Sequence, residues 1–136
     1  SSEAMKRYQN RISGPLLDRI DLHLDVPPLH ANELQNKTAV ENSDTVRQRV
    51  IQAYALQMQR QQCLNHALTP QQLEQFAILD AQAEKMMEMA QQRLNLSARG
   101  YHRVLRVARS IADLAQHTDI QTTHLSEALS YRAQQN

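Results

Sequence analysis

The chain has 136 residues, enough for one domain of ordinary size, and its hydrophobic content of 41% is sufficient for a core. Its formal net charge of +1 excludes a strong global field for nucleic acid or a membrane surface, so any electrostatic function must be local. The single cysteine, Cys63, excludes an internal disulfide and favours a reducing, cytoplasmic compartment. No apolar run approaches the roughly 20 residues that a membrane span needs.

The N-terminal region differs in pattern from the rest of the chain. Ser13, which is followed by Gly and Pro, can cap a short helical turn. Residues 21–26 (DLHLDV) alternate polar and apolar, which predicts a strand with one buried face that ends at Pro27. A lone strand is not stable, so its partners should lie outside this chain. The chain also begins with Ser1 rather than Met, and we therefore expect it to be a fragment of a larger protein.

Helices are predicted for the remainder of the chain. Residues 31–42 are polar and aperiodic, which indicates a linker. Beyond it, N-cap residues followed by helical periodicity predict five helices that pack as an all-α bundle. Named from N-cap to last residue, these helices are Ser43 to Gln62, Thr69 to Ile78, Asp80 to Leu94, Ser97 to His117 and Thr122 to Arg132.

The periodicity of the apolar residues also predicts which side chains face the core. In chain order, these inward residues are Val46, Val50, Ala53 and Tyr54; Leu68 and Leu73; Met86, Met87, Ala90 and Leu94; Tyr101, Val104, Leu105, Ala108, Ile111, Ala112 and Ala115; and Leu125, Ala128 and Leu129.

Four arginines follow Ser97 within a short distance. Arg99, Arg103 and Arg106 share the face opposite the apolar one, and Arg109 lies about 60° away from them at 100° per residue. The next acidic residue is Asp113, so these arginines either remain solvated or bind anions from elsewhere. A solvated polar face and a site for phosphate, of a nucleotide or of nucleic acid, are both compatible with the pattern.

A fifth arginine, Arg19, lies on the turn before the predicted strand, where Asp18 and Asp21 flank it. By itself this pattern favours a local ion pair. A phosphate-binding loop needs Gly-Lys-Ser/Thr, but neither Gly14 nor Gly100 precedes a lysine, so the chain cannot build one. The six histidines show no i, i+4 pair, and no metal site is predicted.

Two segments together resemble one family. Residues 7–27 (RYQNRISGPLLDRIDLHLDVP) resemble the end of the AAA+ core in magnesium chelatase-related ATPases, closest to the competence-type, ComM/YifB-like branch. Residues 94–132 (LNLSARGYHRVLRVARSIADLAQHTDIQTTHLSEALSYR) resemble the C-terminal helical lid of the same family. This resemblance implies an AAA+ core end at 1–30, a linker at 31–42 and a lid domain at 43–136.

The resemblance also implies a mechanism. Arg19 would be an arginine finger that reaches the γ-phosphate of ATP held by the neighbouring subunit, and Arg99 would be the second sensor arginine. The full-length protein would bind ATP and Mg²⁺, form a homo-hexamer and process DNA as a helicase or branch-migration motor in competence. Residues 21–26 would be an edge strand of the missing core sheet. This chain alone would bind no nucleotide and would be inactive.

Two other classes of function remain open from the residues. One is a stand-alone helical DNA-binding module, in which Arg99, Arg103 and Arg106 contact phosphates. The other is a protein–protein interaction bundle without a ligand. Salt-dependent binding of duplex DNA by the isolated chain would favour the DNA-binding module.

Overall fold

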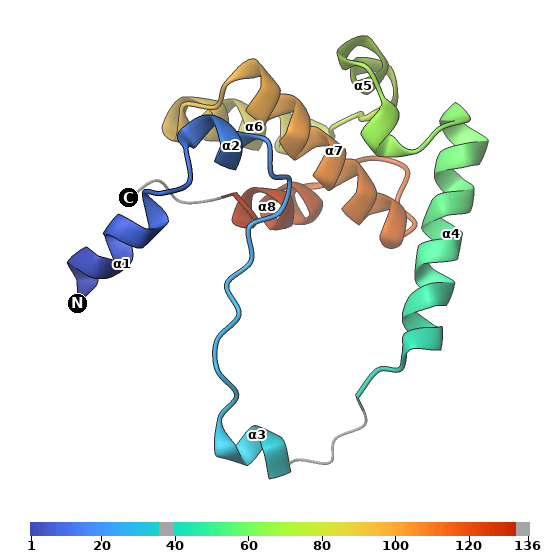
Figure 1. Cartoon of the computed structure of the whole chain (residues 1–136). Helices are drawn as coiled ribbons and strands as arrows, with labels where there is room; N and C mark the ends of the chain where they lie inside the picture. Colours follow the sequence, from blue (N-terminus) through green and yellow to red (C-terminus); the bar gives the residue numbers. More distant parts are fainter. Residues whose placement is uncertain (36–39, 133–136) are drawn as a thin grey trace.

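A computed structural model describes residues 1–35 and 40–132, and its regular secondary structure there consists of helices connected by turns and extended segments. Within these ranges there is no strand, and a single parallel bridge joins Leu79 to Ile120, so the predicted all-α fold is confirmed. No helix in the described ranges is long and apolar enough to cross a membrane. The elements are α1 (Ser2–Gln9), α2 (Gly14–Asp18), α3 (Ala31–Gln35), α4 (Ser43–Gln61), the 3₁₀ turn η1 (Asn65–Ala67), α5 (Pro70–Phe76), α6 (Ala81–Leu94), α7 (Ala98–Leu114) and α8 (Thr122–Ser130) (Figure 1).

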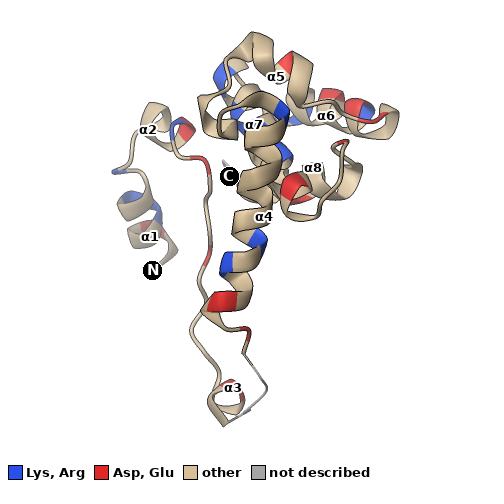
Figure 2. Cartoon of the chain, turned by 90° about the vertical axis from the view of Figure 1, so that its right-hand side faces the viewer, with Lys and Arg blue, Asp and Glu red and all other residues tan. Residues whose placement is uncertain are grey.

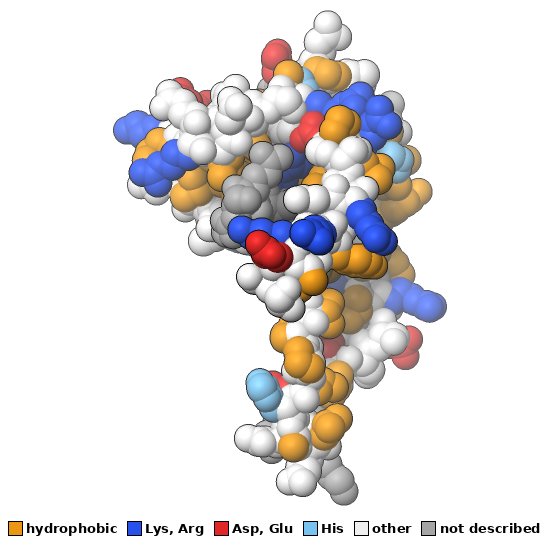
Figure 3. Space-filling model, turned by 60° about the vertical axis from the view of Figure 1, so that its left-hand side comes forward, with side chains coloured by type: hydrophobic (Ala, Val, Ile, Leu, Met, Phe, Trp, Pro, Cys, Tyr) orange, Lys and Arg blue, Asp and Glu red, His pale blue; other side chains and the backbone are white. Residues whose placement is uncertain are grey.

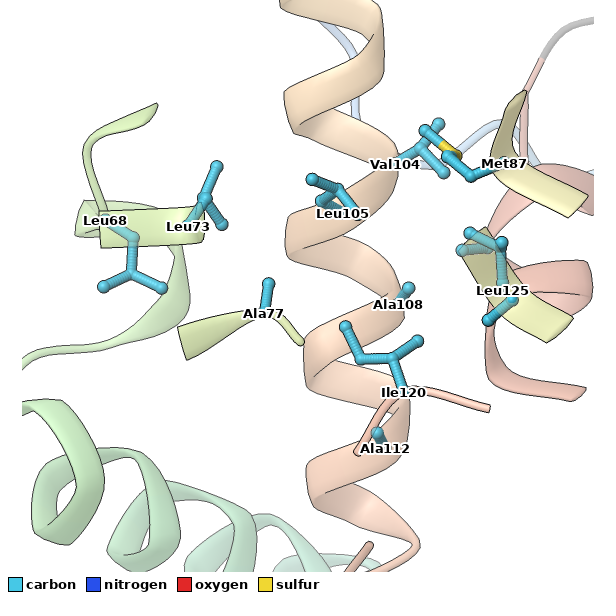
Figure 4. Close-up of a cluster of buried hydrophobic side chains, with 12 residues drawn as sticks. Leu68, Leu73, Ala77, Met87, Val104, Leu105, Ala108, Ala112, Ile120 and Leu125 are labelled. Carbon is cyan, nitrogen blue, oxygen red and sulfur yellow. The ribbon is translucent and has the colours of Figure 1, made fainter. Parts of the chain in front are cut away.

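Helix α7 is the centre of the bundle, and α4, α5, α6 and α8 are arranged around it (Figure 1). Its inward face carries small and branched side chains, which let the surrounding helices approach closely (Figure 4). The core consists of Leu68, Leu73, Ala77, Ala83, Met87, Val104, Leu105, Ala108, Ala112, Ile120, Leu125 and Ala128. Most of the inward positions predicted on α6, α7 and α8 are thereby confirmed, but Leu94 and Ala115 are exposed.

The helix starts follow from local capping chemistry. Thr69 forms the predicted capping box with Gln72, and Asp80 and Ser97 cap α6 and α7 as predicted. The predicted N-caps of α4 and α8 are each one residue late. Asn42 caps α4 because its side-chain oxygen accepts a hydrogen bond from the Thr45 amide at 2.8 Å.

The inward face predicted for α4 is largely wrong. Val46, Val50 and Tyr54 are 40%, 53% and 52% exposed, whereas Ala53 and Gln57 are buried. Every residue from 43 to 52 is exposed, because only the C-terminal half of α4 packs on the rest of the bundle. An amphipathic pattern reports that a helix has an apolar face, but it does not report whether this chain covers that face.

The strand predicted at 21–26 does not form within the described residues, and its assignment as an edge strand of a core sheet stays a prediction. The segment is extended, but its one backbone hydrogen bond to another part of the described chain runs from the His23 amide to the Tyr131 carbonyl at 2.7 Å. A strand needs a neighbouring strand to satisfy its backbone groups, and none lies within the described residues.

The segment between residue 26 and α3 extends away from the bundle (Figure 1). The short helix α3 lies within the predicted linker, and residues 36–39 of that linker fall outside the described residues. Exposed apolar side chains line this protruding part of the surface (Figure 3), among them Leu24, Val26, Leu29 and Leu34.

A buried polar network joins α4 and η1 to α7. Asp113 accepts hydrogen bonds from Arg60 at 2.6 and 3.0 Å and from Asn65 at 3.0 Å, and it lies 3.1 Å from a guanidinium nitrogen of Arg109. Arg109 is fully buried, and it also donates to the carbonyls of His117 and Thr118 at 2.7 Å each. Burial lowers the pKa of Arg109, and the Asp113 carboxylate opposes that shift.

Candidate functional site

The turn that carries Arg19 is docked on the bundle by α2. Ser13 caps α2 through the Leu16 amide at 3.3 Å, and Pro15 occupies the first turn, where its missing N–H costs nothing. The last residue of α2, Asp18, accepts hydrogen bonds from the Ser97 hydroxyl at 3.2 Å and from the Arg132 guanidinium at 2.7 Å. One carboxylate thus joins α2 both to the N-cap of α7 and to the end of α8.

The other side of the same turn is held as well. Asp21 forms an ion pair with Arg103 of α7. The His23 ring nitrogen Nε2 lies 3.1 Å from the Leu17 carbonyl and 3.2 Å from the Ile20 carbonyl, which closes the turn onto itself. Together with the backbone bond to Tyr131, these contacts fix the chain on both sides of Arg19.

Arg19 itself is exposed, and it forms no ion pair or side-chain hydrogen bond with the described residues. The expected local pair with Asp18 or Asp21 is therefore wrong. Each of these carboxylates is already bound to an arginine from the C-terminal bundle, and Arg19, at the C-cap of α2, is left without a partner in residues 1–35 and 40–132.

Arg99 lies in a groove of about 880 Å³ beside the docked turn. Ser97 caps the helix through the Gly100 amide at 3.0 Å, so Arg99 belongs to the first turn of α7. The groove is lined by three arginines and one aspartate, together with residues of α2, the α6–α7 connection and α8; the charged residues are Arg93, Arg99, Arg132 and Asp18. The excess of positive over negative side chains, together with the N-terminus of α7 at the edge of the groove, favours binding of an anion such as phosphate.

Gly100 allows the close packing beneath this groove. A methyl group built there would lie 3.2 Å from Arg132 Nη2, 3.3 Å from Ser97 Oγ and 3.4 Å from Asp18 Oδ1. The absence of a side chain at Gly100 therefore lets the three polar groups meet over the first turn of α7.

The remaining arginines of α7 are engaged within the described part of the molecule. Arg103 is paired with Asp21, Arg106 donates to the Leu68 carbonyl at 2.8 Å, and Arg109 is buried in the network around Asp113. Of the α7 arginines, Arg99 alone forms no hydrogen bond or ion pair with the described residues. Basic and acidic residues are interspersed over the bundle rather than gathered on one face (Figure 2).

The hydrogen bond from Arg132 lowers the pKa of Asp18 below its usual value; burial opposes this shift, and the bond from Ser97 adds to it. Asp18 is therefore a carboxylate at neutral pH, and the ion pair with Arg132 is maintained. Sequence reasoning missed the roles of Asp18, Asp21 and Arg132. Its one usable signal was the run of arginines without a local acidic partner.

The charged hydrogen-bond donors of the groove are guanidinium groups, which suit the phosphates of a nucleotide. Guanidinium groups bind phosphate oxygens in a fork, and no partner among the described residues would have to be displaced from Arg99 by an anion. Within residues 1–35 and 40–132, no group of three or more His, Cys, Asp or Glu side chains could hold a metal ion.

Two family matches cover nearly all of the chain. The family described as magnesium chelatase, subunit ChlI C-terminal, matches residues 40–132, and the family described as magnesium chelatase, subunit ChlI, matches residues 1–34. The chain belongs to the magnesium chelatase ChlI C-terminal family. It is a ComM/YifB-like, magnesium chelatase-related protein, and its bundle is a lid module of that AAA+ type.

Curated relatives agree with this assignment. The chain is 42% identical over 134 residues to the competence protein ComM of Haemophilus influenzae and 44% identical over 133 residues to the protein YifB of Escherichia coli. A protein of Mycobacterium bovis is 35% identical over 131 residues. The matches cover 98%, 96% and 93% of this chain but 26% of each relative, so the chain spans about a quarter of their length.

Proposed function

We propose that this chain is the lid and intersubunit module of a hexameric AAA+ motor that binds ATP and Mg²⁺ and acts on DNA in the cytoplasm. In this proposal Arg19 is the arginine finger that acts on nucleotide held by the neighbouring subunit, and Arg99 is the second sensor arginine. Arg103 and Arg106, which the sequence also offers for nucleic acid, serve inside the module instead.

The observation that carries the proposal is the difference in engagement among the arginines of the docked turn and of α7. Arg103, Arg106 and Arg109 each have an internal partner, whereas Arg19 and Arg99 have none within the described residues. Exposed guanidinium groups free of an internal anion suit contact with a phosphate from outside the module. The same observation weakens the alternative of a DNA-binding stripe, because two of its three arginines are already bound.

The two arginines would act by electrostatic stabilisation. When bound, ATP with Mg²⁺ supplies the γ-phosphoryl group whose transfer to water drives the motor. A guanidinium group at the γ-phosphate stabilises the charge that develops in the transition state, and a finger from an adjacent subunit makes hydrolysis depend on assembly. The role on DNA rests on the family resemblance of residues 7–27 and 94–132, and the similarity to a protein named competence protein ComM supports a role in competence.

The test is ATP hydrolysis by the full-length protein. Arg19→Ala should lower kcat by about 10³-fold or more while nucleotide affinity changes less, as for other arginine fingers. Arg99→Ala should also abolish most turnover. Arg99→Lys should rescue it poorly, because an ammonium group lacks the planar fork that matches phosphate oxygens.

The control is Arg47→Ala, which removes an equally exposed arginine from α4, away from the groove, and should leave turnover unchanged. Mixing Arg19→Ala subunits with subunits that carry a disabled phosphate loop should restore part of the activity, because one intact interface can form. Normal turnover of the Arg19→Ala protein would exclude the finger assignment. Loss of DNA affinity with unchanged turnover in Arg99→Ala would favour the DNA-binding module.

A further inference from the structure

The two acidic residues beside Arg19 are bound by arginines that lie far away in the sequence. Asp18 is separated by 114 positions from its partner Arg132, and Asp21 by 82 positions from its partner Arg103. All four side chains lie outside the hydrophobic core, at the place where the Arg19 turn meets the bundle.

We propose that the ion pairs Asp18–Arg132 and Asp21–Arg103 position the Arg19 turn on α7, so that Arg19 and Arg99 are held as one unit. The proposal rests on the function proposed above for Arg19. In this arrangement Asp18, Asp21, Arg103 and Arg132 are positioning residues that need not touch the nucleotide.

The placement of the pairs on the two sides of Arg19 supports this role. Asp18 precedes Arg19 directly and is bound at the start of α7, where its second hydrogen bond comes from the Ser97 cap. Asp21 follows Arg19 by two residues and is bound at Arg103, six residues or about one and a half turns beyond Ser97. The segment is thus held at two points, one at the N-cap of α7 and the end of α8 and the other at Arg103 of α7. These two contacts restrict the direction of the Arg19 turn.

The pairs also keep Arg19 free of its neighbours. A carboxylate adjacent to a finger arginine would compete with phosphate for the guanidinium group. Both flanking carboxylates are bound to other arginines, so in the described part of the chain Arg19 need not break an ion pair in order to bind a phosphate. Gly100 is needed for the same contacts, because a side chain there would crowd Arg132, Ser97 and Asp18.

Correct positioning matters for a finger because its effect depends on geometry at the reacting phosphate. A displacement of about 1 Å can cost on the order of 10²-fold in rate. Loss of either pair should therefore lower turnover, but by less than loss of Arg19 itself.

The experiment compares single variants and a charge swap in the full-length protein. Asp21→Asn and Arg103→Gln should each lower kcat for ATP hydrolysis by about 10- to 100-fold with a smaller change in KM. The double variant Asp21→Arg with Arg103→Asp should recover much of the loss, because Asp21 is largely exposed and the reversed pair can form in the same place. Glu41→Gln with Arg49→Gln, which removes the exposed ion pair at the start of α4, is the matched control and should leave kcat unchanged.

Amide hydrogen exchange on the 136-residue chain gives a second measurement that does not need an assembled ring. Asp18→Asn and Asp21→Asn should speed exchange at residues 16–23, while exchange in α7 stays at the wild-type rate. If docking of this segment is unaffected in both variants, the pairs do not hold it and the inference is overturned.

The outcomes separate this inference from the proposed function. If Arg19→Ala retains normal turnover, the finger assignment itself fails. If Arg19→Ala is inactive but Asp21→Asn and Arg103→Gln keep the wild-type kcat, the positioning role alone is wrong. A loss of kcat that follows a loss of thermal stability, without recovery in the charge swap, also overturns it.

Discussion

Replacement of Asp113 by Ala tests the buried network that joins α4 and η1 to α7. The side chain of Asp113 is 1% exposed, and it binds two arginines and one asparagine. Its removal leaves Arg109, whose side chain is also 1% exposed, without a carboxylate, although the carbonyls of His117 and Thr118 remain. Breaking a buried ion pair by removal of one partner costs about 3–5 kcal/mol.

That loss is large compared with the roughly 5–15 kcal/mol by which domains are stable. For a chain of this size it corresponds to a fall in Tm of roughly 10–15 °C. Asp113→Asn keeps an acceptor of the same shape for Arg60 but removes the charge, so its cost should lie below that of Asp113→Ala.

Urea unfolding followed by circular dichroism measures these free energies on the isolated chain. Glu41→Ala is the control, because its pair with Arg49 is exposed and such pairs contribute at most about 1 kcal/mol. If Asp113→Ala costs no more than Glu41→Ala, the reasoning about the buried network is refuted.

Two further predictions concern α7 and α8. Gly100→Ala should change the free energy of unfolding by less than about 1 kcal/mol, because the better helix propensity of Ala offsets the crowding. The added methyl group should disturb the hydrogen bond from Arg132 and so raise the pKa of Asp18 toward its usual value. NMR titration of the carboxyl group measures this pKa, and a value as low as in the wild type would contradict the prediction. Burial, then His117 and Arg109, lower the pKa of His124, while Glu127 and Asp80 oppose the shift. The folded state then binds fewer protons than the unfolded state, so the free energy of unfolding should be full above pH 6.5 and should fall as the pH drops from there toward the folded pKa. If the free energy of unfolding of His124→Asn falls with pH as steeply as that of the wild type, the prediction is refuted.

Local interactions made much of the bundle predictable. The capping box at Thr69, the caps at Asp80 and Ser97, and the small apolar face of α7 each depend on residues within a few positions, and each was confirmed. The resemblance of the family segments could likewise be read directly from the residues, and the family matches agree with it. The roles of Arg19 and Arg99 stay predictions.

Predictions that depended on distant partners fared less well. The alternation at 21–26 indicates a strand, but strand formation needs a neighbouring strand, and the described residues contain none. The apolar stripe of α4 indicates a covered face, yet Val50 is exposed because the bundle packs only on the C-terminal half of that helix. Tyr54 is exposed because the covered face there carries Ala53 and Gln57 instead.

What the sequence by itself determined is where α5, α6 and α7 begin and which face of α7 is buried, because backbone capping and helical periodicity act over one or two turns. Tertiary structure decided which arginines of the Arg19 turn and of α7 have a partner among the described residues. On the sequence, Asp18 stands next to Arg19, but the fold brings Arg132 to it across 114 positions. Charge pairing is set by distance in space rather than along the chain, so no local pattern could separate Arg19 and Arg99 from the arginines that hold the module together.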